Sequence, residues 1–314
     1  MATPIITLGN RAKQMQKNND RFRGCLLGLA VGDAVGTAVE FKARGTFVPL
    51  TDMVGGGPFR LKPGQWTDDT SMALCLATSL VECQGFDAQD QMQRYWAWYQ
   101  EGYLSSTGQC FDIGNTVLKA LERYRQTGNP YSGSSHPRSA GNGCIMRLAP
   151  IPLFYFPDRE QTLLFSGESS KTTHGADECL EASRLLGNIL WSALSGLSKA
   201  DLLTYQPPPL SCPSLQTIAS GSYQTKPLEE IRGSGYVVES LEAALWSFWT
   251  TDCFEAAILK AANLGDDADT TAAICGQIAG AYYGAAAIPS PWLACLTLRE
   301  EIIHLSDRLT KDCQ

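Results

Sequence analysis

The sequence has few of the residues that build a zinc site or a disulfide framework. Only three histidines, His136, His174 and His304, occur in 314 residues, and their local sequences are unrelated. The eleven cysteines are scattered singly and form no C-x-x-C motif. They therefore predict neither a zinc ribbon nor a disulfide-stapled domain, and we expect them to be reduced. Acid–base and metal chemistry would fall mainly to carboxylates.

The sequence also lacks a basic block, a secretion signal and a long apolar run. Lysine and arginine number 25 against 32 aspartates and glutamates, a net charge of −7. Without a basic stripe, this charge argues against a nucleic-acid partner. Residues 1–20 lack the apolar segment of a signal peptide, and we find no run of about 18 apolar residues that would span a membrane. The sequence predicts a cytoplasmic protein with no nucleic-acid and no membrane partner.

Helical patterns dominate the chain after residue 20, and alternating strand patterns are scarce. Residues 1–20 are polar and are expected to form a loose tail, and no change of composition divides residues 21–314. The predicted fold class is a single all-α domain. We expect Asp252 to cap a helix, Gly128 and Gly265 to end helices, and helices over 68–82, 88–101, 113–126, 176–196, 236–250, 252–263, 268–285 and 290–306.

Glycines recur at every fourth position in residues 22–36, at 24, 28, 32 and 36. On a helix they would share one face, so another backbone could approach closely and packing would offset the low helix propensity of glycine. No Gly-Lys-Ser/Thr follows, which excludes a phosphate loop. Two connections stand out: residues 127–143 are long enough to favour a binding loop, and residues 205–214 predict a rigid surface turn.

Two acidic clusters stand at the heads of helix-like runs: "GQWTDDTSMALCLATSL" (64–80) and "GDDADTTAAICGQIAGAYYG" (265–284). Helix capping would explain one such cluster. The second precedes a helix so rich in alanine and glycine that we expect it to be buried, where unpaired carboxylates are unfavourable. No lysine or arginine is nearby to pair with these carboxylates, and a hard divalent cation would supply the opposite charge. The predicted metal ligands, enough for two ions, are Thr67, Asp68, Asp69, Asp267, Asp269 and Thr270.

Two other metal-associated motifs fit the second cluster less well. An EF-hand loop starting at Asp267 would need glycine and glutamate where positions 272 and 278 are alanine and isoleucine. The D-x-D-x-T of residues 267–271 also matches aspartyl-phosphate phosphatases. That motif follows an apolar strand, whereas "EAAILKAANLG" before it predicts a helix.

Further motifs give the chain a family resemblance. They are "GLAVGDAVGTAVEF" (28–41), "FDIGNTV" (111–117), "GNGCIMRLAP" (141–150), "THGADE" (173–178) and "GSGYVVESLEAALW" (233–246). With the two acidic clusters, residues 21–306 resemble the ADP-ribosylglycohydrolases. The resemblance implies an all-α fold, two Mg or Mn ions in a cleft, and hydrolysis of the bond between a protein side chain and C1 of the terminal ribose. The expected partners are an ADP-ribosylated protein and ADP-ribose, and "FDIG" resembles the branch that acts on ADP-ribosyl-arginine.

The same resemblance implies roles for individual residues. Asp112 would handle the proton at the scissile bond, its alternative being a helix N-cap. Glu40, like Asp33, matches an acidic position near the metals, its alternative being a solvated helix-end charge. The ligand-binding residues implied are Gly141, Asn142 and Gly143 around the distal ribose and phosphates, Arg147 at a phosphate, His174, and Tyr236 stacked on adenine. For Arg147 a structural role, and for residues 141–143 a flexible turn, stay open.

Two functions of other classes also stay open. The first is a non-catalytic ADP-ribose-binding protein, which loss of metal ligands would favour. The second is an immunity factor that binds an ADP-ribosylating toxin through residues 1–20.

Overall fold

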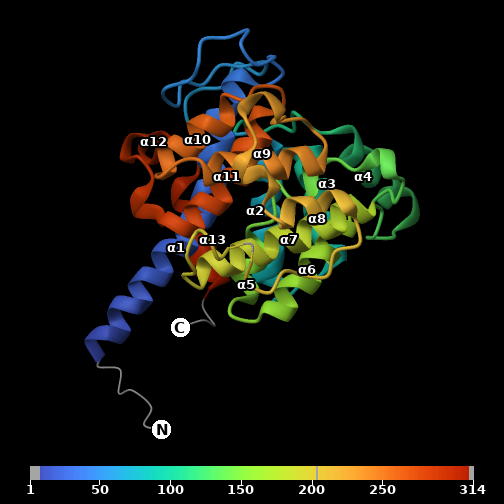
Figure 1. The fold of residues 1–314 in the computed structure, drawn as a ribbon. Helices are drawn as coiled ribbons and strands as arrows, with labels where there is room; N and C mark the ends of the chain where they lie inside the picture. The colour runs from blue at the N-terminus through green and yellow to red at the C-terminus, as the bar shows by residue number, and fades with distance from the viewer. Residues whose placement is uncertain (1–7, 203, 311–314) are drawn as a thin grey trace.

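The structure, a computed structural model, describes residues 8–202 and 204–310, with side chains from Asn19 onward. Within these residues the chain forms thirteen α-helices and short 3-10 turns, and no strand. The all-α fold class is therefore confirmed (Figure 1). The division into a tail and one domain from residue 21 stays a prediction.

The helices are α1 (Leu8–Gly36), α2 (Asp68–Cys83), α3 (Ala88–Glu101), α4 (Asn115–Thr127), α5 (Pro150–Tyr155), α6 (Arg159–Lys171), α7 (Asp177–Leu194), α8 (Pro213–Ala219), α9 (Val237–Trp249), α10 (Phe254–Ala262), α11 (Ala268–Tyr283), α12 (Ser290–Cys295) and α13 (Arg299–Leu309). Seven of the eight expected helices lie within about two residues of these bounds. As expected, Gly128 ends α4 in the left-handed conformation, and Gly265, with φ of +74°, follows the end of α10.

The remaining expectations about helices were incomplete. The helix expected over 290–306 is two helices, since Leu298 takes a φ of +53° between them. The N-cap of α10 is the extended Cys253, not Asp252. Helices α5 and α8 begin at prolines, which we did not interpret as helix starts. The polar α6 was also missed, although Asp158 gave a signal: its side chain caps Gln161 N at 3.0 Å.

Helices α1 and α11 pack against each other through the glycine face of α1. A β-carbon built at any of its four glycines would lie less than 3.0 Å from backbone atoms. At Gly28, Gly32 and Gly36 these atoms belong to α11, and at Gly24 they belong to residues 280–285. Gly276 and Gly280 of α11 are equally close to the backbone of α1. The expected close approach is confirmed, and it brings the carboxyl end of α1 to the amino end of α11.

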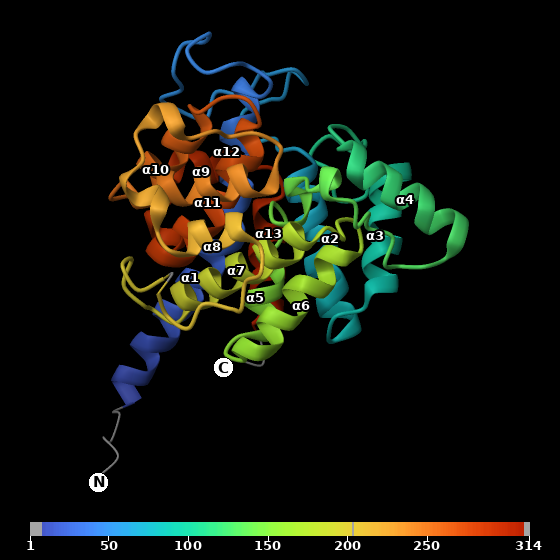
Figure 2. The same ribbon diagram turned by 45° about the vertical axis from the view of Figure 1, so that its right-hand side comes forward.

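The amino-terminal end of α1 corrects two expectations. Residues 8–20, which we placed in a loose tail, are helical and project from the body of the molecule (Figures 1 and 2). Residues 1–7 of that tail lie outside the described residues, so toxin binding there stays untested. The expectation of no membrane-length apolar run is also corrected, since residues 19–39 contain an 18-residue window apolar enough, by mean hydropathy, to cross a membrane. Because 94% of that window is buried inside the protein, a core helix meets the same criterion.

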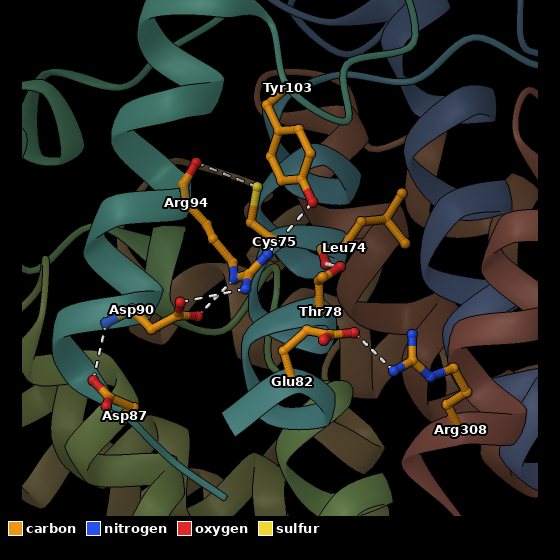
Figure 3. Close-up of polar contacts among 9 residues, drawn as sticks. All are labelled: Leu74, Cys75, Thr78, Glu82, Asp87, Asp90, Arg94, Tyr103 and Arg308. Atoms are coloured by element: carbon orange, nitrogen blue, oxygen red, sulfur yellow. Dashed lines mark hydrogen bonds and ion pairs between the residues drawn. The ribbon is translucent and has the colours of Figure 1, made fainter. Parts of the chain in front are cut away.

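Helix α2 is held in place at its far end by its neighbours (Figure 3). Glu82 pairs with Arg308 of α13 at 2.7 Å. The thiol of Cys75 lies 3.7 Å from the carbonyl of Arg94 on α3, and Arg94 pairs in turn with Asp90 at 2.6 Å. The first two contacts join α2 to α13 and α3, whereas the Arg94–Asp90 pair lies within α3. The amino end of α2 carries the first acidic cluster.

Candidate active site

The amino end of α2 is capped by a carboxylate from α1. Asp33 Oδ1 accepts hydrogen bonds from the backbone N and Oγ1 of Thr67, both at 2.9 Å. Asp33 Oδ2 accepts from the N and Oγ1 of Thr70, at 3.0 and 2.6 Å. Capping therefore does occur at the first cluster, but the cap comes from another helix. The carboxylates of Asp68 and Asp69 are thereby free for other roles.

The two acidic clusters meet in space. Thr67 Oγ1 lies 3.3 Å from Asp269 Oδ2, and Thr270 Oγ1 donates to Asp69 Oδ1 at 3.2 Å. Of the six predicted metal ligands, five are buried and Asp267 is half-buried. Two segments about 200 residues apart therefore form one cluster, as the sequence predicted.

Carboxylate oxygens of this cluster suit a hard divalent cation. Asp33, Asp69 and Asp269 each place an oxygen within 4.8 Å of the others, and so do Glu40, Asp112 and Asp269. Asp69 Oδ2, Asp269 Oδ1 and Glu40 Oε2 are buried without a hydrogen-bond partner. None of the ion pairs among the described residues involves this cluster. Buried, unpaired oxygen donors are the ligands that Mg, Ca or Mn select.

Burial and mutual repulsion raise the pKa of every carboxyl in the cluster. Burial is the first cause at each residue, and it raises the pKa of Asp33 to about 6, of Asp112 to about 7 and of Glu40 to about 10. The pKa values of Asp68, Asp69, Asp267 and Asp269 are raised for the same reason. Without a cation the cluster therefore holds protons at pH values where free carboxylates are ionised.

Without divalent cations the protein is expected to lose stability as the pH rises. Carboxyls whose pKa is raised by folding bind more protons in the folded state, so their contribution is complete below about pH 4. It is lost as the pH rises through about 6 at Asp33, about 7 at Asp112 and about 10 at Glu40. His174, whose pKa burial lowers to about 3, has the opposite effect only below about pH 6.5. Thermal unfolding of chelator-treated protein between pH 6.5 and 8.5 checks this. A melting temperature that rises across that range would contradict it, and the Asp112→Asn variant should show a weaker decrease.

A cavity of about 690 Å³ opens over the carboxylate cluster. Its lining includes the acidic-cluster residues and their neighbours Glu40, Asp68, Asp112, Asp267 and Thr270, together with Gly141, Asn142, Gly143 and His174. Asn142 Nδ2 donates to Asp267 Oδ2 at 2.6 Å and to Ser240 Oγ at 3.1 Å. The predicted binding loop is thus fixed to the amino end of α11. Residues 142–144 form a 3-10 turn.

The structure resolves the alternatives for Asp112 and Glu40. Asp112 has a φ of +59° and lies before the N-cap of α4, which is Gly114, so it does not cap that helix. Glu40 is 3% exposed and is therefore no solvated helix-end charge. Both residues face the cavity.

Tyr236 and Arg147 lie outside the lining of this cavity. Tyr236 lines an adjoining cavity of about 550 Å³ that also contacts Gly141. Its hydroxyl donates to Glu178 Oε1 at 2.7 Å, and 37% of the residue is exposed. Arg147 is 1% exposed and lies over the ring of Tyr95 at 4.8 Å. Its expected place at a phosphate is therefore corrected to a position in the core.

Phe41 is one of several cavity-lining residues that the sequence reasoning missed. It is 68% exposed and has a φ of +60°. Its ring lies 6.5 Å from that of Phe59, which in turn lies 5.1 Å from Phe111. The only signal was its position directly after Glu40, which carries no information about exposure.

Comparison with known proteins agrees with this site. The ADP-ribosylglycohydrolase family matches residues 14–314. The chain is 47% identical over 290 residues to "ADP-ribosylarginine hydrolase Tri1" of Serratia proteamaculans, covering 92% of this chain and 79% of that protein. It is 32% identical over 295 residues to "ADP-ribosyl-[dinitrogen reductase] glycohydrolase" of Rhodospirillum rubrum, covering 90% and 92%.

A solved structure extends the likeness to three dimensions. A chain of an "ADP-ribosylglycohydrolase-related protein complex" superposes with a TM-score of 0.84 at 44% identity, covering 95% of this chain and 100% of that one. The helical fold, the paired acidic clusters and the cavity above them thus accompany a match over nearly the whole chain. This protein belongs to the ADP-ribosylglycohydrolase family.

Proposed function

We propose that this protein hydrolyses the N-glycosidic bond between ADP-ribose and arginine side chains of modified proteins. The observation that carries the proposal is the set of buried carboxylate oxygens without a hydrogen-bond partner, on Glu40, Asp69 and Asp269, of which Glu40 lines the cavity of about 690 Å³. The arginine linkage rests on the names of relatives in Serratia proteamaculans and Pseudomonas putida, both called ADP-ribosylarginine hydrolase. The expected partners are an ADP-ribosylated protein and ADP-ribose, and the expected location is the cytoplasm.

The carboxylates would hold two divalent cations, Mg or Mn. Asp33, Asp69 and Asp269 form one candidate ligand group, and Glu40, Asp112 and Asp269 form another. Thr67, Asp68, Asp267 and Thr270 complete the oxygen-rich surroundings. Bound cations would orient the ribose hydroxyls and lower the pKa of a bound water. They would also offset the negative charge that ADP-ribose brings to an acidic cavity.

Asp112 is the residue placed to move a proton. Burial raises its pKa to about 7, which suits a group that both accepts and donates a proton near neutral pH. It lies beside Glu40 at the cavity, in the carboxylate group that also includes Asp269. Asp112 would pass a proton from water to the departing guanidine as the glycosidic bond breaks through an oxocarbenium-like state.

The loop of residues 141–143 would hold the diphosphate side of the ligand. The backbone N–H groups of Gly141 and Asn142 already donate to Ser139 O at 2.8 Å and Gly235 O at 3.1 Å. The N–H of Gly143 is therefore the one that would donate to a phosphate oxygen without the help of a lysine. Asn142, which bonds Asp267, links this loop to the carboxylate cluster.

The proposal is tested by release of ADP-ribose from an arginine-modified protein with Mg, with Mn and with a chelator, beside a serine-modified protein. We expect cation-dependent release from arginine only. With Mg or Mn at saturating concentration, Asp112→Asn should lower kcat by about 100-fold or more and leave ADP-ribose affinity within about twofold. A non-catalytic binding protein would instead bind ADP-ribose and release none from either substrate.

The controls separate catalysis from folding. Glu122→Gln removes one exposed carboxylate of α4 outside the cavity and should leave kcat unchanged. If Asp112→Asn abolished ADP-ribose binding as well, Asp112 would have a structural role. Release from the serine-modified protein would refute the arginine linkage.

A further inference from the structure

His174 is a buried ring held rigidly beside the glycine loop. Its backbone N donates to Ser170 O at 2.7 Å, and its carbonyl accepts from Ser170 Oγ at 2.9 Å. The residue is 2% exposed and lines the cavity. A β-carbon at Gly143 would lie 2.7 Å from its Cε1 and one at Gly141 would lie 3.3 Å from its Nε2. The imidazole therefore lies closer to the loop than a side chain at position 143 would allow, and a side chain at position 141 would be tightly packed against it.

The Nδ1 atom of this ring is engaged on the side of the core. Thr173 Oγ1 lies 2.8 Å from His174 Nδ1. The same hydroxyl accepts a hydrogen bond of 2.6 Å from Arg147 Nη2. Both Thr173 and Arg147 are buried, at 0% and 1% exposure. Water is thus kept from this chain of three side chains.

The directions of these two hydrogen bonds follow from the donors available. A guanidinium can only donate, so one lone pair of Thr173 Oγ1 is occupied by Arg147. The hydroxyl hydrogen then needs an acceptor, and within the described part of the chain the only atom recorded for it is His174 Nδ1. If Nδ1 carried the proton instead, the threonine hydrogen would be buried without a partner, which is unfavourable. Nδ1 is therefore the acceptor.

Arg147 itself is fixed in position. Its guanidinium lies over the ring of Tyr95, whose hydroxyl accepts from Gln91 Nε2 at 2.9 Å. Arginine keeps its charge at every accessible pH, so it never becomes an acceptor. Its charge also disfavours an imidazolium: burial first, and Arg147 second, lower the pKa of His174 to about 3. The ring is neutral at physiological pH.

We propose that Arg147 and Thr173 are positioning residues that fix His174 as the neutral Nε2–H tautomer, so that the ring donates a hydrogen bond to an oxygen of the ligand in the cavity. Identifying that ligand as ADP-ribose rests on the proposed function. The tautomer itself does not, because it is set by contacts within the protein. A donor at Nε2 favours a ligand atom with lone pairs, such as a phosphate or hydroxyl oxygen.

The test is nitrogen NMR of the full-length protein labelled with ¹⁵N-histidine. Only three histidines are present, so spectra of the His136→Gln and His304→Gln variants assign His174. At neutral pH we expect His174 Nε2 protonated and Nδ1 unprotonated, before any ligand is added. Thr173→Val removes the hydroxyl at nearly constant volume and should introduce the Nδ1–H tautomer. It should also weaken ADP-ribose binding about tenfold.

Conservative and matched variants complete the test. Thr173→Ser retains a hydroxyl and should restore both the Nε2–H tautomer and the affinity. Thr162→Val changes a buried threonine of α6 that bonds Asp158 O, and it should alter neither. An imidazolium or an Nδ1–H tautomer in the unaltered protein would overturn the proposal, as would a Thr173→Val spectrum identical to wild type. If the Nε2–H tautomer were present but ADP-ribose did not bind, the proposed function would be refuted, whereas the positioning of His174 by Thr173 and Arg147 would be supported.

Discussion

Asp269→Asn is expected to abolish cation-dependent activity and, without cations, to make the protein more stable than wild type. Asp269 is 1% exposed, and its Oδ1 has no hydrogen-bond partner. It is the only residue that belongs to both candidate ligand groups among the described residues. Even a residue that merely orients a metal ligand contributes about 10- to 100-fold. We therefore expect at least about a 100-fold loss of ADP-ribose release.

The gain in stability without cations has an electrostatic cause. Burial, Glu40 and Asp69 all raise the pKa of Asp269, which means that its ionised form is disfavoured in the folded protein. An amide of the same shape removes that repulsion. Thermal unfolding with chelator should give the variant the higher melting temperature, and adding Mg or Mn should raise the melting temperature of wild type only.

A surface carboxylate outside the site serves as the control for Asp269→Asn. Glu122→Gln removes an equal charge from the exposed face of α4 and should respond to cations as wild type does. If Asp269→Asn were less stable than wild type in chelator, or still gained stability from Mn, Asp269 would not be a cation ligand. Calorimetry should also show that a chelator weakens ADP-ribose binding of the unaltered protein at least about tenfold.

Gly36→Ala is expected to inactivate the protein, whereas Gly24→Ala at the other end of the same face should mainly lower stability. A β-carbon at Gly36 would lie less than 3.0 Å from the Cα and N of Asp269 and from the carbonyl of Ala268. A β-carbon at Gly24 would meet the backbone of residues 280–285 equally closely. Each added methyl forces backbones apart, at about 1–3 kcal/mol, against a gain of about 1 kcal/mol in helix propensity.

The two variants therefore separate packing from site geometry. Both should unfold at lower denaturant concentration than wild type, by similar amounts. Only Gly36→Ala displaces the residue that joins the two ligand groups, so its kcat should fall at least about 100-fold under conditions where both variants are folded. Equal activity of the two folded variants would show that the amino end of α11 tolerates displacement. A β-carbon at Gly28 would meet the carbonyl of Gly276, about two turns from the site. The activity of Gly28→Ala should therefore lie between those of Gly36→Ala and Gly24→Ala.

Local patterns in the sequence determined much of this protein. The four-residue spacing of glycines predicted the close packing of α1 on another helix, because a helix places every fourth residue on one face. The repeated acidic cluster before a helix of small residues predicted a cation site, because buried carboxylates need an opposite charge. Three helices were missed because their sequences show no clear helical periodicity: the polar α6, and α5 and α8, which begin at prolines.

Only the tertiary structure decided which atoms meet. That Asp33 caps α2, that Arg147 bonds Thr173 instead of facing the cavity, and that Asn142 bonds Asp267 all depend on contacts between residues far apart in sequence. Composition and periodicity report which face of an element is buried. The partner of a buried polar group depends on how the helices cross, and that is set by packing across the whole core.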